Sequence, residues 1–300
     1  MRRYSLKECR DEEWSELFPQ AVEDAAALSV NVTRSILARW SSSDMQNKPF
    51  AESLLGIPIH VVDFGEVAVC VNHWIKERHR PSAYIVQANA LSLVSAQDDS
   101  LYNQAIKHAD LAVPDGMPLV WLLRGKRNQV KGRVYGPDLM LHLCENAARY
   151  KWRCFLYGGK PGVPELLADV LIRRFPGLAV VGTLSPPFRP LTESEEENIR
   201  ATINETRPDI IWVGLGGPKQ DIWMHENRNA LDVSVIHGVG AAFDFITGRI
   251  PQAPRWVMNC GLEWLFRLLV EPRRLWKRYT IVNLKFLYYL VKLECLKRII

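Results

Sequence analysis

The chain has 300 residues, of which 48% are hydrophobic and 24% charged, so it can bury a full core and disorder throughout is excluded. The formal net charge of +5 at pH 7 is mild, and it favours phosphate or anionic surfaces because the cations gather near the C-terminus. No apolar run reaches the ~18–20 residues that span a bilayer, and none follows Arg2 and Arg3, so we expect neither a membrane span nor a secretory signal.

The predicted elements begin with an N-terminal extension over residues 1–55, which holds one helix at 21–40 and then a linker. Over 56–250, short β-branched and aliphatic runs alternate with stretches of helical period. Strands are predicted at 59–64, 84–87, 111–114, 153–157, 178–182, 210–214 and 233–237, and helices at 92–109, 136–150, 163–175 and 193–206. This alternation predicts a doubly wound, Rossmann-like α/β domain whose parallel sheet is covered on both faces.

Residues 251–300 predict a basic, aromatic, amphipathic C-terminal appendage. Four cations recur at spacings of four and seven, which would form a stripe on one helix: Arg274, Arg278, Lys285 and Lys292. The intervening positions are strongly apolar, and tryptophans precede them. This pattern favours a helix lying in the plane of a membrane surface, because aromatic and basic side chains both suit that interface. The alternative is a terminal helix packed on the domain with a solvated basic edge.

The first candidate site follows the predicted strand at 210–214, where the sequence runs G-L-G-G-P-K-Q. Gly214 and Gly216 allow a ligand to approach the backbone. A helix that begins near Pro218 points N–H groups at a diphosphate. Lys219 and Gln220 lie in its first turn and add donors. An ordinary strand-to-helix turn would also contain Gly and Pro.

A second glycine turn follows the predicted strand at 233–237. Gly238 and Gly240 end that strand, and Asp244 is placed to accept hydrogen bonds from ribose hydroxyls. Asp244 is equally suited to cap a helix or to pair with Arg249 or Arg255.

Polar side chains follow two further predicted strands. Asp115 comes directly after the strand at 111–114, between Pro114 and Gly116, so it projects into the crevice at the strand's carboxyl end. An ionised carboxylate there can accept a proton from an attacking hydroxyl, although a P-D-G sequence is more often an ordinary turn. Gln87 and Asn89 follow the strand at 84–87, where they can bind sugar hydroxyls or, for Asn89, cap the next helix.

Several common site patterns are missing from the sequence. There is no D-x-D pair to hold a divalent cation, and neither the six scattered cysteines nor the seven histidines have metal-ligand spacing, so no metal or other cofactor is expected. A diphosphate would then be met by helix dipoles, Lys and Arg. The turn at 238–240 lacks the third glycine of G-x-G-x-x-G, which disfavours a nicotinamide-dependent oxidoreductase.

Taken in order, these motifs resemble those of the WecG/TagA/CpsF family of bacterial glycosyltransferases (glycosyltransferase family 26) over roughly residues 57–278. The matching positions are Asn89, Pro114-Asp115-Gly116, Arg133, Gly136, Y-G-G-K-P-G at 157–162, G-L-G at 214–216, P-K-Q at 218–220, G-V-G at 238–240, F-D at 243–244, A-P at 253–254, L-E-W at 262–264, Arg267 and E-P-R-R at 271–274.

The resemblance implies an inverting, metal-independent transferase that moves a hexose or N-acetylhexosamine from a UDP-sugar to a polyprenyl-diphosphate-linked acceptor. It implies that Asp115 is the base, that Gln220 and Asp244 contact the donor, and that Arg133 stabilises diphosphate charge. Family members carry an arginine-rich appendage that closes over the site and touches the membrane, here Arg267, Arg273 and Arg274.

The partners that follow are a UDP-sugar, a lipid-linked saccharide and an anionic membrane, without nucleic acid. The expected location is the cytoplasmic, inner face of a bacterial plasma membrane. The apolar C-terminal surface would suit a bilayer or a second subunit equally, so a homo-oligomer is the alternative use of it. A non-catalytic, UDP-binding scaffold at the membrane is the alternative function.

Three positions depart from the family pattern. Gln87 stands where the family usually has Thr, Asp221 replaces the usual Glu, and Gln252 replaces the usual Arg. The substitution at Gln87 leaves the identity of the sugar open.

Overall fold

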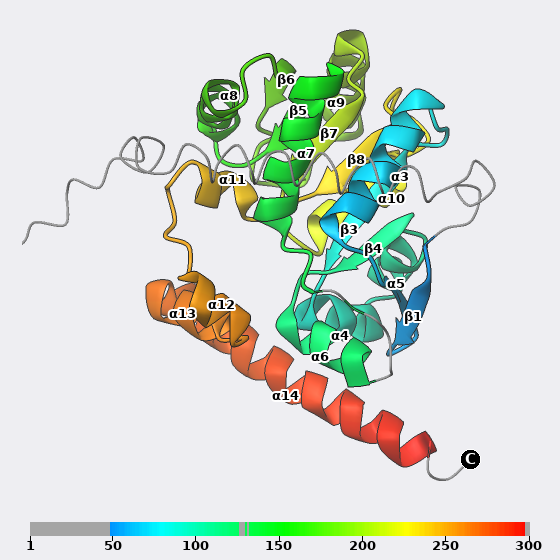
Figure 1. Ribbon diagram of the computed structural model, residues 1–300, viewed down its shortest axis with the longest axis vertical. Coiled ribbons are helices and arrows are strands. Elements are labelled where there is room, and N and C mark those ends of the chain that lie inside the picture. The colour runs from blue at the N-terminus through cyan, green and yellow to red at the C-terminus, as the bar shows by residue number, and fades with distance from the viewer. Residues whose placement is uncertain (1–48, 126–129, 131, 298–300) are drawn as a thin grey trace, which may run out of the picture. The chain divides into compact units, whose positions relative to one another are not determined.

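The computed structural model describes residues 49–125, 130 and 132–297 (Figure 1). The predicted helix at 21–40 and nearly all of the N-terminal extension lie outside the described residues.

A six-stranded, all-parallel sheet forms the centre of the described chain, in the order β4-β3-β8-β7-β5-β6. Its strands are β3 (Ala83–Ala88), β4 (Leu111–Pro114), β5 (Arg153–Gly158), β6 (Ala179–Leu184), β7 (Ile210–Gly214) and β8 (Val235–Gly238). The predicted parallel α/β fold is thus confirmed, with strand ends that differ by at most two residues from those predicted.

The strand predicted at 59–64 does not join this sheet, and the prediction was wrong in both extent and partner. Instead β1 (Ala51–Leu54) and β2 (Ile57–His60) pair as an antiparallel hairpin. The strand ends early because Asp63 caps α3 (Phe64–Lys76). Its side chain accepts a hydrogen bond from the Glu66 backbone N–H at 2.9 Å, and the Glu66 carboxylate accepts one from the Asp63 N–H.

Helices cover both faces of the sheet (Figure 1). Alternate strand residues point to opposite faces, so Tyr84 and Val86 pack in one apolar cluster and Ile85 packs in the other. The first face is covered by α4 (Ala90–Asp98), α5 (Ser100–Lys107), α9 (Glu193–Thr206) and α10 (Lys219–Asn227), and the second by α3, α7 (Gly136–Tyr150), α8 (Val163–Arg174) and α11 (Ala242–Ile246). Each Leu, Ile or Val fully buried in these clusters contributes about 1.5–3 kcal/mol to folding.

The helix predicted at 92–109 is two helices. Asp99 has extended backbone angles, and its carboxylate accepts hydrogen bonds from the backbone N–H groups of Leu101 and Tyr102. It therefore ends α4 and caps α5. Aspartate is a common N-cap, but the uninterrupted apolar spacing across it hides the break.

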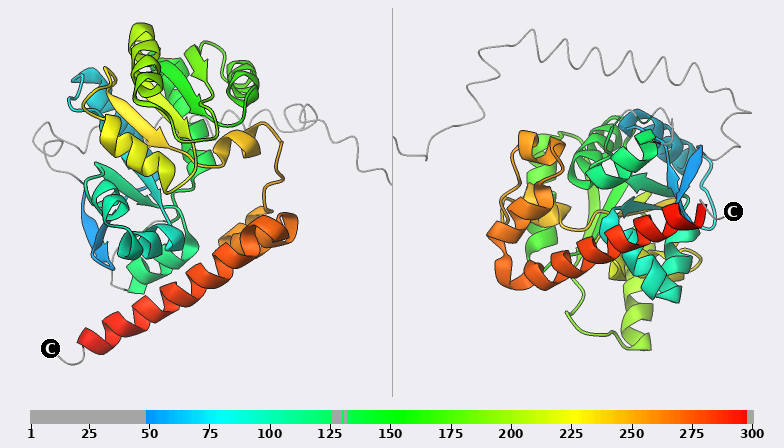
Figure 2. Two further views of the ribbon diagram at one scale, coloured as in Figure 1. Left: turned by 180° about the vertical axis from the view of Figure 1, so that it is seen from behind. Right: turned by 90° about the horizontal axis from the view of Figure 1, so that it is seen from below.

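Three helices follow the sheet: α12 (Arg255–Asn259), α13 (Glu263–Val270) and α14 (Pro272–Lys297). The long α14 lies along α4, as Figures 1 and 2 show. Its Val282 and Phe286 are buried in the first apolar cluster, and Lys285 Nζ lies 2.6 Å from a carboxylate oxygen of Asp98. Among the helices of the described residues, none is long and apolar enough to cross a membrane.

The order of the strands creates a crevice near the middle of the sheet. From β3 the chain moves outward to β4 on one side, and from β5 it moves outward to β6 on the other, while β7 and β8 fill the centre. Helices that leave neighbouring strands in opposite directions separate at the carboxyl ends of those strands. Open α/β sheets bind ligands at such a switch point.

Candidate active site

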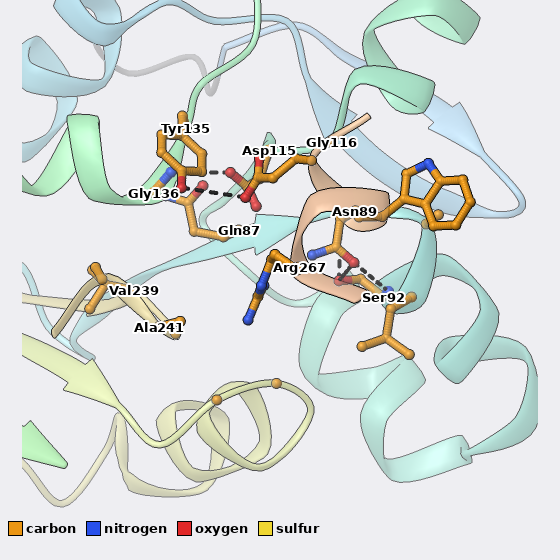
Figure 3. Close-up of a pocket in the computed structure, with 18 of the residues that line it drawn as sticks. Gln87, Asn89, Ser92, Asp115, Gly116, Tyr135, Gly136, Val239, Ala241 and Arg267 are labelled. Atoms are coloured by element: carbon orange, nitrogen blue, oxygen red, sulfur yellow. Dashed lines mark hydrogen bonds between the residues drawn. The ribbon is translucent and has the colours of Figure 1, made fainter. Parts of the chain in front are cut away.

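A cavity of about 370 Å³ lies at the carboxyl ends of the central strands (Figure 3). Residues from the helices that follow these strands line it, and α13 and α14 contribute further lining residues. This volume is within the range of small-molecule sites. The predicted site residues that line it are Gln87, Asn89, Asp115, Arg133, Gly214, Gly216, Gln220, Gly240 and Arg267.

Of the remaining predicted site residues, those with described side chains do not line the cavity. Lys219 Nζ lies 5.4 Å from the ring centre of Phe188, and Asp244 pairs with Arg249 at 3.6 Å, one of the alternatives left open above. Gly238 lies behind Gln220, and Arg273 is exposed on α14. Arg274 belongs to α14, but its side chain is outside the described part of the structure.

Asp115 sits at the end of β4 with one carboxylate oxygen held. Oδ1 accepts a hydrogen bond from the Gly136 backbone N–H at 3.1 Å and lies 3.6 Å from a guanidinium nitrogen of Arg133. Both contacts use Oδ1, so Oδ2 is the oxygen left to accept a proton. Burial raises the pKa of Asp115, Arg133 opposes this, and the negative charge of Glu263 adds to it. A carboxylate with a raised pKa is a stronger base than an ordinary one.

Arg133 is fixed from several sides. Its Nε donates to the Asp115 backbone carbonyl, and its guanidinium packs 4.1 Å from the ring centre of Tyr135. A second guanidinium nitrogen lies 2.6 Å from a carboxylate oxygen of Glu263, which belongs to α13. Much of the charge of Arg133 is therefore balanced by Asp115 and Glu263. These contacts act mainly on the Asp115 carboxylate and on the position of α13.

Gln220 holds the two glycine turns together. Its Oε1 accepts hydrogen bonds from the backbone N–H groups of Gly216 at 3.1 Å and Gly240 at 3.0 Å. Both glycines have positive φ, +79° and +57°, which favours glycine. A Cβ on Gly238 would lie 2.9 Å from the Gln220 amide nitrogen, so a side chain there would displace Gln220. These two N–H groups are therefore occupied by Gln220.

Asn89 has one of the two roles predicted for it, the helix cap, and it is also placed at the cavity. Its Oδ1 caps α4 by accepting from the Ser92 backbone N–H at 3.2 Å, while the residue also lines the cavity. Gly116 is close behind, since a Cβ there would lie 3.2 Å from the Asn89 Cβ. The P-D-G turn and the β3–α4 turn are thus packed against each other, which places Asp115 beside the sugar-binding side of the cavity proposed below.

Arg267 of α13 is, with Arg133, one of the two cations that line the cavity with described side chains. Its guanidinium packs 5.5 Å from the ring centre of Phe245, and its Nε has no hydrogen-bond partner within the described residues. In Figure 3 it lies between Asn89 and the turn at Val239 and Ala241. A buried donor without a partner is costly unless a ligand satisfies it, so Arg267 is suited to an anionic group.

Some site residues were not selected from the sequence. Glu263 and Tyr135 bracket Arg133, and their distant positions in the chain gave no signal beyond the L-E-W match of the family pattern. Asp221 lines the cavity wall and accepts from the Tyr102 hydroxyl at 3.0 Å. Burial raises the pKa of Asp221 to about 7. Within the described ranges, no three His, Cys, Asp or Glu side chains gather in a metal-ligating arrangement.

The fold and the cavity define an α/β protein with a cavity of small-molecule size at the switch point of a parallel sheet. Its lining includes a carboxylate with a raised pKa, Asp115, and an arginine, Arg267, whose Nε has no hydrogen-bond partner within the described residues. The family model described as "Glycosyl transferase WecG/TagA/CpsF family" matches residues 52–298 of the chain. The chain therefore belongs to this family and is a glycosyltransferase, as the resemblance predicted.

A relative from Bacillus spizizenii is 29% identical over 225 residues, which is 74% of this chain and 85% of that protein. The relative is named N-acetylglucosaminyldiphosphoundecaprenol N-acetyl-beta-D-mannosaminyltransferase. Its name describes transfer of an N-acetylmannosaminyl group to a saccharide carried on a polyprenyl diphosphate.

Proposed function

We propose that the protein transfers a hexose or N-acetylhexosamine from a UDP-sugar to a polyprenyl-diphosphate-linked saccharide, with inversion and without a metal ion, in cell-surface polysaccharide synthesis. The relative's activity supports the substrate classes. The observation that carries the proposal is Asp115, a carboxylate with a raised pKa and one unheld oxygen at the carboxyl end of β4.

The proposed reaction is a single displacement. An acceptor hydroxyl attacks the anomeric carbon from the face opposite UDP, and its proton moves to Oδ2 of Asp115. The new glycosidic C–O bond forms as the bond between the anomeric carbon and the diphosphate oxygen breaks, and the electron pair of that bond leaves with UDP. One displacement inverts the anomeric carbon. General-base help of this kind is typically worth ~10²–10⁴ in rate.

We assign the stabilisation of negative charge on the departing diphosphate chiefly to Arg267. Arg133 is already paired with Glu263, and the N–H groups of Gly216 and Gly240 are taken by Gln220. Arg267 has an unpaired donor and lines the same cavity as Asp115. A cation preorganised where negative charge grows stabilises the transition state more than the ground state.

The proposed location is the cytoplasmic face of a bacterial plasma membrane, reached through the exposed side of α13 and α14. Arg273 and Lys277 are exposed there and add positive charge. The large apolar side chains exposed on these two helices include Leu269, Ile281, Leu284, Leu287, Tyr288 and Val291. Such a surface suits an anionic bilayer. Because Tyr279 and Asn283 of α14 also line the cavity, a membrane on this side would present its lipid-linked acceptor near the site.

The test is transfer from a panel of radiolabelled UDP-sugars, including UDP-N-acetylmannosamine and UDP-glucose, to a polyprenyl-diphosphate-linked N-acetylglucosamine, with EDTA present throughout. We expect transfer from one donor class, and an inverted anomeric configuration in the product. UDP binding without transfer from any donor would support the non-catalytic scaffold instead, and dependence on added Mg²⁺ or Mn²⁺ would contradict the metal-independent mechanism.

A further inference from the structure

A buried histidine lies directly behind the cavity and contacts one of its lining residues. His237 is on β8 and is fully buried, and Gln87 is on the neighbouring β3 with 8% of its surface exposed. The Gln87 amide nitrogen is 2.8 Å from His237 Nε2. The displacement described above uses neither side chain.

This contact fixes the state of the imidazole. An amide nitrogen can only donate, so with the Gln87 nitrogen turned to His237, Nε2 of the ring is the acceptor and the ring's proton is on Nδ1. Within the described residues, Nδ1 is buried and has no hydrogen-bond partner, so no second contact opposes this tautomer. The surroundings favour a neutral ring, because burial lowers the pKa of His237 to about 3 and Trp212 packs 5.4 Å away between ring centres.

The same contact fixes the orientation of the Gln87 carboxamide. With its nitrogen turned to His237, its Oε1 must point elsewhere, and this oxygen is buried without a hydrogen-bond partner within the described residues. A buried acceptor left unpaired costs about 1–3 kcal/mol, and a ligand with a donor there would remove that cost.

Gln87 also lies next to the catalytic carboxylate. A Cβ on Gly136 would lie 3.4 Å from Gln87 Cγ, and the N–H of Gly136 holds Asp115 Oδ1. Figure 3 shows Gln87, Gly136 and Asp115 grouped at one side of the cavity. Any group that hydrogen-bonds to Gln87 Oε1 is therefore beside the reacting atoms.

We propose that His237 is a positioning residue, which turns Gln87 so that its Oε1 accepts a hydrogen bond from a hydroxyl or amide N–H of the sugar bound beside Asp115. The pair would thus select sugars that carry a donor group at that point. This rests on the proposed glycosyl transfer and deepens it. Sites that bind a substrate polar group strongly reject analogues that lack it, because the protein group is then left unpaired.

The kinetic test uses a double-mutant cycle with His237→Leu and Gln87→Met, which remove the hydrogen bond while keeping similar volumes. We expect each single variant to lower kcat/KM for the sugar donor by about 10-fold or more. The double variant should lose no more than Gln87→Met alone, because the histidine acts through the glutamine. His237→Gln, which keeps an acceptor, should restore much of the activity. UDP affinity, measured by calorimetry, should not change, since UDP lacks the sugar.

Additive losses in the double variant, or equal weakening of UDP binding, would show that His237 is merely structural and overturn the proposal. A second measurement does not depend on transfer. In protein labelled with ¹⁵N-histidine, His237 should show the neutral Nδ1–H tautomer, and Gln87→Met should shift its Nε2 resonance. An Nε2–H tautomer would overturn the assignment of Gln87 Oε1 as the acceptor, even if transfer itself is confirmed or fails.

Discussion

At the scale of single residues, the site depends on how the charge of one carboxylate is balanced. Asp115 has a pKa raised by burial and by Glu263, and Arg133 works in the opposite direction. Arg133 is itself 2.6 Å from Glu263, so the three form a chain of alternating charge from β4 to α13. Removing the charge of Arg133 and removing the charge of Glu263 should therefore move the pKa of Asp115 in opposite directions.

Arg133→Gln should move the acid limb of the kcat/KM profile to higher pH, because loss of the positive charge makes ionisation of Asp115 harder. Glu263→Gln should move it to lower pH, because a negative neighbour is removed. Profiles from pH 4 to 8 measure both. Limbs that move in the same direction would mean that the variants act by misplacing Asp115 rather than by charge.

Asp221 should make the wild-type protein less stable as pH rises from about 4 to 7. Its pKa is raised from 3.8 to about 7 by burial, against hydrogen bonds from Tyr102 and Gln220. Across that window the folded protein keeps the proton and the unfolded chain has lost it, so stability falls with increasing pH. Below it both states are protonated, and above it the loss is constant.

The Asp221→Asn variant should lack this fall, and should gain roughly 2–4 kcal/mol relative to wild type between pH 4 and pH 7.5. Denaturant unfolding at several pH values measures it, and Asp169→Asn, at an exposed carboxylate of α8, is the matched control. Parallel pH dependence in wild type and Asp221→Asn would contradict the assignment.

At the scale of elements, the site is held by contacts between turns. Gln220 at the start of α10 accepts from the turns after β7 and β8, and Asn89 at the start of α4 packs against the P-D-G turn after β4. Each turn takes its position from a neighbouring one. The carboxyl edge of the sheet therefore behaves as one connected unit.

Gln220→Leu should leave two backbone N–H groups without their acceptor and should destabilise the protein by about 1–3 kcal/mol. UDP binding should weaken as well, because the turns bordering the cavity lose their shared contact. Lys219→Ala is the control from the same helical turn, and its exposed side chain should matter by less than ~0.5 kcal/mol. If Gln220→Leu keeps wild-type UDP affinity, Gln220 does not organise the nucleotide site.

Much of the carboxyl edge of the sheet was predictable from the sequence. Buried parallel strands appear as short apolar runs, and the carboxyl ends of such strands meet at one edge of the sheet. Asp115, Asn89 and both glycine turns were found on that ground, and Gln220 followed from its place in the first turn of a helix. Lys219 does not line the cavity and instead lies over Phe188, because sequence position fixes a turn but not the direction of a side chain. Glu263 was missed because its pairing with Arg133 spans 130 positions of the chain, which local patterns do not encode.

The break between α4 and α5 and the early end of β2 have a different origin. In both places a single aspartate, Asp99 or Asp63, caps a new helix inside a segment with continuous apolar spacing. Hydrophobic periodicity reports which face is buried, and it does not report where one helix stops and another starts.

At the scale of the whole described chain, α14 has two opposite faces with different environments. Leu275, Val282 and Phe286 are buried against the domain, and Lys285 is paired with Asp98. Leu284, Leu287 and Val291 are exposed on another side, at spacings of three and four. The two alternatives for this helix, packing on the domain and contact with a membrane, are therefore compatible, because they use different faces.

Leu284→Glu combined with Leu287→Glu should weaken binding to vesicles that contain anionic phospholipid, because charge would replace apolar contact at the membrane surface. Flotation with vesicles of phosphatidylglycerol and phosphatidylethanolamine measures this. Leu166→Glu, at an exposed leucine of α8, is the control and should bind normally. Unchanged flotation of the double variant, combined with a change in its oligomeric state, would assign this face to a second subunit.

The most direct test of the account is turnover by Asp115→Asn with UDP binding measured on the same preparation. The asparagine keeps the shape of the side chain and can still occupy the contact with Gly136, but it cannot take the acceptor's proton. We predict a loss of ~10²–10⁴ in kcat with unchanged affinity for UDP. Near-normal turnover would contradict the assignment of Asp115 as the base, and with it the mechanism built on this cavity.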